Sequence, residues 1–142
     1  MQPPVPNAFA LELTVAEEDI DAQEHVSNVR VLEWMNRAAI AHSDALGFDV
    51  ARYREVGGMF VVRRHEIDYL APSYLGERLV AYTWPAALSR ASAERRHEVR
   101  RVADGAVIAR GWNLWAYVDV ASGRPRRIDA AVAEAFDPAQ FV

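Results

Sequence analysis

The chain of 142 residues contains no cysteine, which excludes disulfide bonds, thiol nucleophiles and cysteine-based metal sites. It also contains no lysine, and all sixteen of its basic residues are arginine. No segment is long and apolar enough to span a bilayer, and the opening MQPPVPNAFA has neither the basic start nor the apolar run of a secretory signal. These absences predict a cytoplasmic protein.

The chain is moderately acidic, with a formal net charge of −4 at pH 7. An acidic chain is a poor general binder of nucleic acid, because that affinity depends on neutralising phosphates. A local cluster of arginines can still hold a small phosphorylated ligand. Hydrophobic residues make up 51% and charged residues 25% of the sequence, so we predict one globular domain spanning residues 1–142.

One long helix and five strands are predicted along the chain. Residues 29–47 are apolar or small around most of the helix circumference, which is typical of a helix buried on several sides. Ser27 or Asn28 is expected to cap this helix, and Gly47 is expected to end it. A short helical piece is expected at 50–56. The predicted strands are 8–16, 59–70, 78–88, 92–102 and 106–120, with an Asp-Gly hairpin turn at 103–106.

This order of elements predicts an α+β fold, in which a curved antiparallel sheet of about five strands wraps around one long helix. Gly111, inside the last strand, indicates a bend or a close approach of another group. One helix cannot cover both faces of such a sheet, so the other face is expected to meet a second subunit. We therefore expect at least a homodimer.

The polar stretch DIDAQEHVSN, residues 19–28, lies directly before the long helix. A helix N-terminus offers unpaired N–H groups and the positive end of the helix dipole, both of which stabilise a developing oxyanion. Asp21 in front of such an end could be a nucleophile, a general base on water, or simply a capping residue. Asn28 fits an N-cap that orients these N–H groups, and Asp19 is expected to be solvated.

The same stretch does not fit a calcium-binding loop. The positions that require glycine and a bidentate glutamate hold Glu24 and Arg30 instead. Neither an HExxH motif nor a serine nucleophile elbow is present. We predict no metal site.

Two blocks, DIDAQEHVSNVRVLEWMNRAA and FVVRRHEIDYLAPSYLGERL, resemble the hot-dog-fold acyl-CoA thioesterases of the 4-hydroxybenzoyl-CoA thioesterase family. The first block is also similar to the plant acyl-ACP thioesterases. The resemblance implies hydrolysis of an acyl-CoA or acyl-ACP thioester, with Asp21 as nucleophile or general base and with roles for Gln23 and His25. Coenzyme A then enters as part of the substrate, no separate cofactor is expected, and a homodimer or homotetramer is implied.

The chain departs from the family pattern at three positions. Glu24 occupies a place often held by a glycine, whose N–H in relatives helps to polarise the thioester carbonyl. Val31 replaces a frequent tyrosine, and Asn36 stands where many bacterial members have glutamate. The alternatives to a thioesterase are a non-catalytic acyl-thioester binding module, a hot-dog hydratase or dehydratase, and a purely structural domain.

Substrate-binding candidates fall into three groups. The phosphates of CoA need fixed cations near the mouth of the site. Arg90 is the first candidate for that role, and the others are Arg63, Arg64, Arg126 and Arg127. Residues that could line an acyl tunnel, or else belong to the ordinary core, are Met59, Phe60, Val61, Trp34 and Trp115. The loop residues Gln23 and Glu24 are expected to lie near the thioester.

Strand alternation separates the arginines of the segment SRASAERRHEVRR. One face carries Arg96 and Arg100 with two glutamates, which is typical of a cross-linked solvent face. The opposite face carries Arg95 and His97, together with Arg101.

Overall fold

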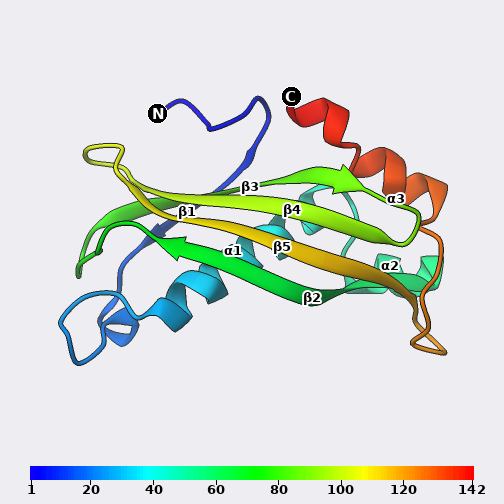
Figure 1. Ribbon diagram of the computed structural model, residues 1–142, viewed down its shortest axis with the longest axis horizontal. Helices are drawn as coiled ribbons and strands as arrows, with labels where there is room; N and C mark the ends of the chain where they lie inside the picture. The colour runs from blue at the N-terminus through cyan, green and yellow to red at the C-terminus, as the bar shows by residue number, and fades with distance from the viewer.

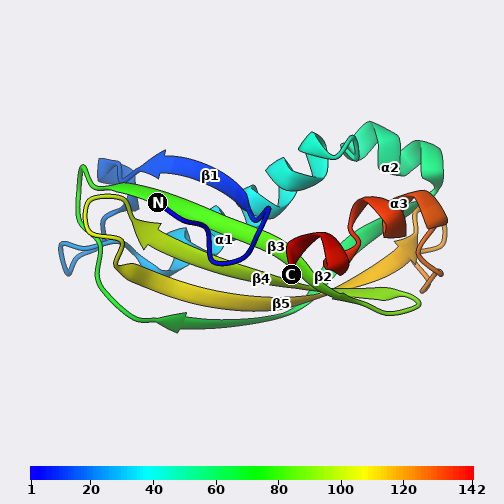
Figure 2. The same ribbon diagram turned by 90° about the horizontal axis from the view of Figure 1, so that it is seen from above.

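The computed structural model describes residues 1–142 and contains one five-stranded antiparallel sheet with helices packed on one side of it (Figures 1 and 2). The long helix α1 (Asn28–Ala45) lies across the sheet, and α2 (Val50–Val56) follows it. The strands are β1 (Phe9–Thr14), β2 (Gly58–Tyr69), β3 (Arg78–Leu88), β4 (Ser92–Arg101) and β5 (Val107–Asp119). The predicted α+β architecture is therefore confirmed, and every predicted element is present with ends that differ by at most two residues.

The strands lie in the order β1-β3-β4-β5-β2, so β1 and β2 are the two edges of the sheet. The hairpins β3–β4 and β4–β5 form its centre, and β2 joins at the far side by pairing with β5 from Gly58↔Asp119 to Tyr69↔Ala109. The strand edge of β2 that faces away from β5 has no partner within the chain.

The N-terminus of α1 is capped by Ser27, whose hydroxyl oxygen accepts a hydrogen bond from the Val29 N–H at 3.3 Å. Asn28 is the first residue of the helix, so the expectation that Asn28 is the N-cap is wrong. At the other end the helix stops at Ala45, and Gly47 follows with a φ of +89°, a left-handed conformation that glycine adopts without a Cβ clash.

The main core lies between α1 and the face of the sheet that it covers. Trp34, Met35 and Ala38 of α1 pack with Leu79 and Val99 of the central strands in one buried cluster. Trp34 is only 3% exposed in this cluster, so it is a core residue and does not line a tunnel. A burial of this kind stabilises the fold by roughly 2 kcal/mol for each large side chain.

The close approach predicted at Gly111 is present. A Cβ added there would lie 2.7 Å from the Met35 sulfur, so only glycine lets α1 sit this low over β5. On the opposite face of the sheet Glu98 pairs with Arg100, as expected, and with Arg110, whereas Arg96 makes no ion pair. Glu98 is 6% exposed, so it is not the solvated residue that was expected. Figure 2 shows that no helix covers that face.

Two features were not predicted from the sequence. The C-terminal segment forms a short helix, α3 (Ala130–Ala135), and its Val132 and the following Phe136 join a second buried cluster with Phe48 and Tyr117. Two 3-10 turns, η1 (Glu17–Asp19) and η2 (Pro138–Phe141), complete the chain. No helix is both long and apolar enough to cross a membrane.

The helix α1 is buried on one side only. Val29 is 63% and Ile40 is 58% exposed, on the side of the helix that faces away from the sheet. The prediction of a helix buried on several sides is therefore not met within one chain. Val29 and Ile40 are eleven residues apart in the helix, and one chain leaves both uncovered.

Candidate active site

The polar stretch before α1 folds into a tight turn. The Asp21 N–H donates to the His25 carbonyl at 3.1 Å, and the Asp21 carbonyl accepts from the Glu24 N–H at 3.0 Å. One carboxylate oxygen of Asp21 accepts from the Gln23 N–H at 2.8 Å. The other oxygen has no hydrogen bond or ion pair within the chain, and the residue is exposed. Asp21 is thus oriented by its own turn while one oxygen stays available.

Glu24 adopts a left-handed conformation, with a φ of +64°. Such a conformation costs roughly 1–2 kcal/mol for a residue with a Cβ and nothing comparable for glycine, which explains in physical terms why glycine suits this position. The Glu24 N–H is already used by the Asp21 carbonyl inside the turn. In this conformation it is not free to polarise a substrate carbonyl.

One hydrogen bond closes the turn, and two more anchor it to the rest of the molecule. The Ser27 N–H donates to the Asp19 carbonyl at 2.9 Å, the Val26 N–H donates to the Ser73 carbonyl at 2.9 Å, and the Tyr69 hydroxyl donates to the Asn28 carbonyl at 3.1 Å. These bonds connect the loop to the C-terminal end of β2 and to the segment that follows it. The position of the loop is therefore fixed relative to the free edge of the sheet.

Asp19 is not solvated, contrary to the sequence-based expectation. It is 7% exposed, and its carboxylate accepts from the Ala16 N–H at 2.8 Å and lies 3.6 Å from the Arg30 Nε. The expectation failed because η1 turns the side chain back onto its own first turn. Asp19 is a structural anchor of the loop. Of the two aspartates, only Asp21 has an exposed carboxylate.

A small cavity of about 210 Å³ lies beside the N-terminus of α1. His25 and Asn28 line it together with Val31, Tyr69 and Ser73, among other residues. Asp21, Gln23 and Glu24 do not line it, and all three are exposed. The structure thus brings His25 and Asn28 together at the helix end, whereas the Asp21 carboxylate lies outside this cavity.

A larger apolar groove of about 450 Å³ lies at the other end of α1. Met59, Phe60 and Trp115, three of the candidates for an acyl tunnel, line this groove, and Val61 does not. The first α1 residue in the groove is Ala39, which lies about 17 Å along the helix from Asn28 at 1.5 Å per residue. Within one chain, the predicted acyl-lining residues and the predicted catalytic loop are therefore far apart.

The arginine candidates differ in how fully they are engaged. Arg90 and Arg63 are exposed and make no ion pair, and Arg64 is also exposed but pairs with Glu66 at 2.6 Å. Arg127 is also exposed and makes no ion pair. None of these four lines the small cavity or the groove.

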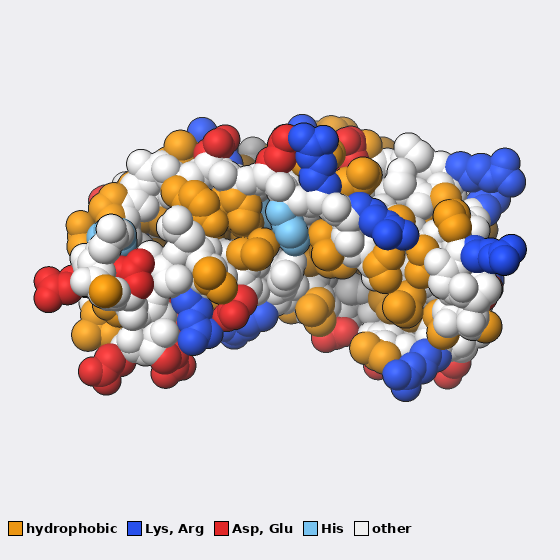
Figure 3. Space-filling view, turned by 60° about the horizontal axis from the view of Figure 1, so that its bottom comes forward, with side chains coloured by type: hydrophobic (Ala, Val, Ile, Leu, Met, Phe, Trp, Pro, Cys, Tyr) orange, Lys and Arg blue, Asp and Glu red, His pale blue; other side chains and the backbone are white.

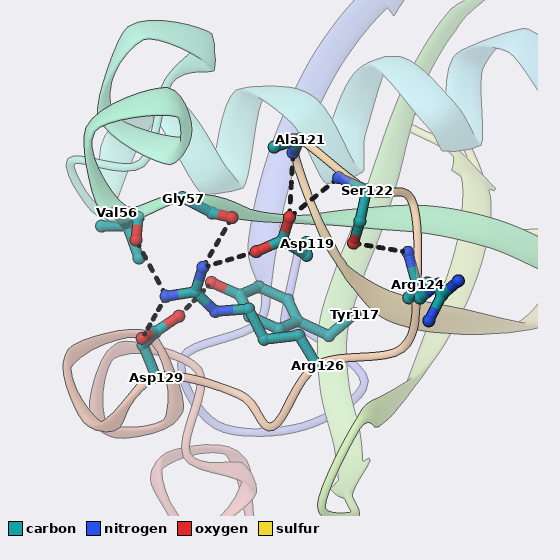
Figure 4. A network of polar contacts seen from close by, with 9 residues as sticks. All are labelled: Val56, Gly57, Tyr117, Asp119, Ala121, Ser122, Arg124, Arg126 and Asp129. Carbon is teal, nitrogen blue, oxygen red and sulfur yellow. Dashed lines mark hydrogen bonds and ion pairs between the residues drawn. The ribbon is translucent and has the colours of Figure 1, made fainter.

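Arg126 is a structural clamp and not a free cation (Figure 4). Its guanidinium donates to the Gly57 and Val56 carbonyls at 2.7 and 3.0 Å, and to Asp119 and Asp129 at 3.2 and 3.0 Å. These bonds tie the end of α2 to the segment that leads into α3. Four of the five N–H donors of Arg126 are thus used within the chain, so Arg126 is a weaker candidate than Arg90 for binding a CoA phosphate.

Strand alternation places Arg95 on the face of β4 opposite Arg96 and Arg100 but does not identify it as a site residue. It is 7% exposed and lines the large groove. Its Nη1 donates to the His42 Nδ1 at 3.0 Å and to the Thr83 hydroxyl at 3.1 Å. The signal that could have found it is an arginine at an inward position of a central strand.

Burial, and secondarily the charge of Arg95, lowers the pKa of His42 from 6.5 to about 4. The His42 ring is therefore neutral at pH 7, which suits its role as the acceptor of the Arg95 hydrogen bond. Burial also lowers the pKa of Arg95 to about 10, so the guanidinium remains protonated at neutral pH. Arg95 is a buried positive charge held by neutral partners.

The strain at Glu24 yields a first prediction. Glu24→Gly should raise the free energy of unfolding by roughly 0.5–1 kcal/mol, because glycine removes the left-handed strain. The gain is smaller than the strain itself, because glycine also increases the entropy of the unfolded chain. Urea denaturation measures the change. Glu24→Ala is the control: it removes the same carboxylate but keeps a Cβ, so it should give no such gain. Equal gains for both variants would show that charge, and not the backbone, is responsible.

The lowered pKa of His42 yields a second prediction. Between its folded pKa of about 4 and its unfolded value of 6.5, the unfolded chain binds more protons, so stability falls as the pH falls through this window and levels off below it. His42→Gln should remove about 2–3 kcal/mol of the stability difference between pH 7.5 and pH 4.5. Urea denaturation at both pH values measures it, and an unchanged difference would contradict the assignment.

Comparison with known proteins supports the fold and the family. The family model described as the thioesterase-like superfamily matches residues 15–136. Comparison with curated proteins finds no match. Among solved structures, a 1,4-dihydroxy-2-naphthoyl-CoA thioesterase from Synechocystis has a TM-score of 0.83 at 17% identity, over 92% of this chain and 96% of that one.

Two further solved structures have similar TM-scores. A Staphylococcus aureus protein solved in complex with CoA has a TM-score of 0.88 at 11% identity, over 99% of this chain and 88% of that one. The 12:0-ACP thioesterase from Umbellularia californica has a TM-score of 0.81 at 20% identity, over 93% of this chain and 50% of that one. At such identities the structural likeness shows the predicted hot-dog fold. The family model matches most of the length of the chain, so the chain belongs to the thioesterase-like superfamily.

Proposed function

We propose that this protein hydrolyses the thioester of an acyl-CoA or acyl-ACP to a free acid and a thiol, with Asp21 as nucleophile or general base. The observation that carries the proposal is the state of the Asp21 carboxylate. One oxygen is fixed by the Gln23 N–H at 2.8 Å, and the other has no hydrogen-bond partner within the chain. Asp21 belongs to the loop that leads into the first residue of α1, Asn28. Membership of the thioesterase-like superfamily supports the reaction class.

The chemistry follows one of two routes. As a general base, Asp21 takes a proton from water, the hydroxide adds to the thioester carbon, and the collapsing intermediate expels the thiolate, which is then protonated. As a nucleophile, Asp21 forms an anhydride and expels the thiolate, and water then cleaves the anhydride. In both routes the carbonyl oxygen becomes an oxyanion, which the helix dipole and unpaired N–H groups stabilise.

The donors for that oxyanion come from the loop and from the first turn of α1. The Glu24 N–H is occupied by the Asp21 carbonyl, whereas the N–H groups of His25 and Asn28 have no partner within the chain. We assign the oxyanion to one or both of these N–H groups. His25, which also lines the small cavity, then orients the water or the carbonyl.

The proposed site is completed by a second copy of the chain. The outer edge of β2 is unpaired over its length, and the exposed Met59 and Val62 belong to this strand. An unpaired strand edge is a template for pairing with another chain. Figure 3 views the side of the molecule along which β2 runs; apolar side chains gather in separate areas of it, and its outline is hollowed in the middle.

An antiparallel pairing of two β2 edges puts the C-terminal end of one strand beside the N-terminal end of the other. Tyr69 holds the catalytic loop through Asn28, and Met59 lines the apolar groove. Such a dimer therefore brings the loop of one chain to the groove of its partner. Two chains then form two sites, each made of the loop of one chain and the groove of the other. The separation of about 17 Å along α1 within one chain therefore does not keep loop and groove apart.

The proposal that CoA or an acyl-carrier protein carries the acyl group is supported by the charge of the exposed arginines. Arg90 is exposed, lies in the turn between β3 and β4, and makes no ion pair, so it is the first candidate for a phosphate of CoA or of an acyl-carrier prosthetic group. Arg63 and Arg64 are the next candidates. A cytoplasmic location, the absence of a resident cofactor and a possible tetramer remain predictions from the sequence.

The catalytic role of Asp21 yields a third prediction. Asp21→Asn should lower kcat by at least about a hundredfold, because the amide is neither a base nor a nucleophile. A chromogenic thiol reagent measures CoA release from acyl-CoAs of varied chain length. Glu18→Gln is the matched control, because Glu18 is an exposed acid close to Asp21 in the chain, and it should retain full activity.

Two results would count against the proposal. If Asp21→Asn keeps most of its kcat, another group performs the chemistry. If the unmodified protein binds acyl-CoA tightly but releases no thiol, the protein is an acyl-thioester binding module, a reading that the engaged Glu24 N–H favours.

The free β2 edge yields a fourth prediction. Analytical ultracentrifugation should give at least twice the 15.9 kDa mass of one chain. Val62→Glu should shift the protein toward monomer, because it places like charges from two chains close together at the paired edges. Val142→Glu, the same change at a 91% exposed C-terminal valine, is the control and should not alter the mass. A native protein that sediments as a monomer would rule out the shared site.

A further inference from the structure

Arg95 is a buried cation without a carboxylate partner. It is 7% exposed, it takes part in none of the ion pairs of the chain, and its hydrogen bonds go to neutral groups of His42 and Thr83. Its guanidinium carbon also lies 5.7 Å from the centre of the Phe136 ring. Removing a charge from water without an opposite charge is costly, so folded proteins seldom do so without a reason.

The free donors of Arg95 are accessible from the groove. Only Nη1 is used within the chain, at 3.0 Å to His42 and 3.1 Å to Thr83. Nε and Nη2 have no partner, and they are not among the fully enclosed unpaired atoms. Because Arg95 lines the groove, the edge of the guanidinium formed by Nε and Nη2 is available to a ligand there. That edge matches the two oxygens of a carboxylate.

The other polar groups of the groove do not replace this donor. The Ser43 hydroxyl donates to the Phe48 carbonyl at 2.6 Å, so the Tyr53 hydroxyl must be the donor in its 2.8 Å bond with Ser43. Both hydroxyl protons are therefore used. The remaining charged residues that line the groove are Asp44, Glu94 and Arg54, and none forms an ion pair with Arg95.

Asp44 and Arg54 are exposed and Glu94 is half-buried, and the other walls of the groove are largely apolar. Its volume is about 450 Å³, and its walls include Ile40, Phe48, Met59, Phe60 and Trp115. A cavity with long apolar walls and one buried cation fits a ligand with an apolar body and one anionic end. A plain hydrocarbon chain would fill the walls but leave the charge of Arg95 without a partner.

We propose that the groove selects an acyl group that carries a carboxylate at the end remote from the thioester, and that Arg95 binds this carboxylate. The proposal rests on the proposed function, because it assigns the groove to the acyl group. The preferred substrate class is thus the monothioester of a dicarboxylic acid. Arg95 is a specificity-determining residue, and it takes no part in the bond-breaking step.

The kinetic test compares octanoyl-CoA with the CoA monothioester of octanedioic acid, which has the same chain length and a terminal carboxylate. The native enzyme should favour the dicarboxylic substrate in kcat/KM by roughly ten- to a hundredfold, mainly through KM, because a charge-assisted bidentate bond is gained. Arg95→Gln keeps a donor for His42 and Thr83 and should abolish or reverse this preference. Arg96→Gln, an exposed neighbour on the opposite face of β4, should leave it unchanged.

A binding test separates this proposal from the proposed function. Calorimetry should show that octanoate binds the native protein at least tenfold more tightly than 1-octanol, and that Arg95→Gln removes the difference. Arg95→Lys keeps the charge and should retain part of the difference in affinity between octanoate and 1-octanol. This variant therefore distinguishes loss of the carboxylate site from a folding defect.

The outcomes are distinct. Cleavage of both thioesters without a carboxylate preference, together with equal binding of octanoate and 1-octanol, overturns the role of Arg95 and leaves the thioesterase standing. No cleavage of any thioester, with Arg95-dependent binding of octanoate, overturns the proposed function and supports a carboxylate site at Arg95.

Discussion

The rest of the structure depends on the packing of α1 against the inner face of the sheet. Gly111 permits that contact, because a Cβ there would lie 2.7 Å from the sulfur of Met35. Around it, Val31, Trp34 and Ala38 are at most 3% exposed. This apolar contact fixes the helix axis across the strands. It thereby sets where both ends of the helix lie, and each end carries one part of the proposed chemistry.

At the N-terminal end, the helix presents a turn that holds Asp21, and Tyr69 ties the first residue of the helix to the end of β2. At the C-terminal end, the helix forms one wall of the groove that contains Arg95. A single rigid helix cannot bring its own ends together. In the proposed dimer, antiparallel pairing of two free β2 edges places the N-terminal end of α1 in one chain beside the C-terminal end of α1 in the other.

The sequence predicted the fold well because its signals are local. Alternation, apolar runs and the Asp-Gly turn predicted every strand to within two residues, and an interior glycine predicted the close approach at Gly111. The short helix α3 was missed because a six-residue helix has almost no periodicity of its own and is held by tertiary contacts. The motif around Asp21 predicted the family, which is confirmed.

The site was harder to predict because its geometry depends on contacts between distant residues. Asp19 and Asp21 are alike in sequence, yet one is buried and the other exposed. Glu24 departs from the family pattern, but only the structure gives its φ of +64° and its engaged N–H. The isolation of Arg95 from any carboxylate is likewise a property of the packed molecule. No local pattern reports any of these facts.

The central claim is that each site is shared between two chains, and a heterodimer tests it most directly. One chain carries Asp21→Asn, and the other carries Ala93→Trp, which fills the groove. Each homodimer should be inactive. The purified heterodimer should recover about half of the native kcat per dimer, because one of its two sites combines an unmodified loop with an unmodified groove. No recovery in a folded heterodimer would mean that loop and groove act within one chain, which would contradict the account.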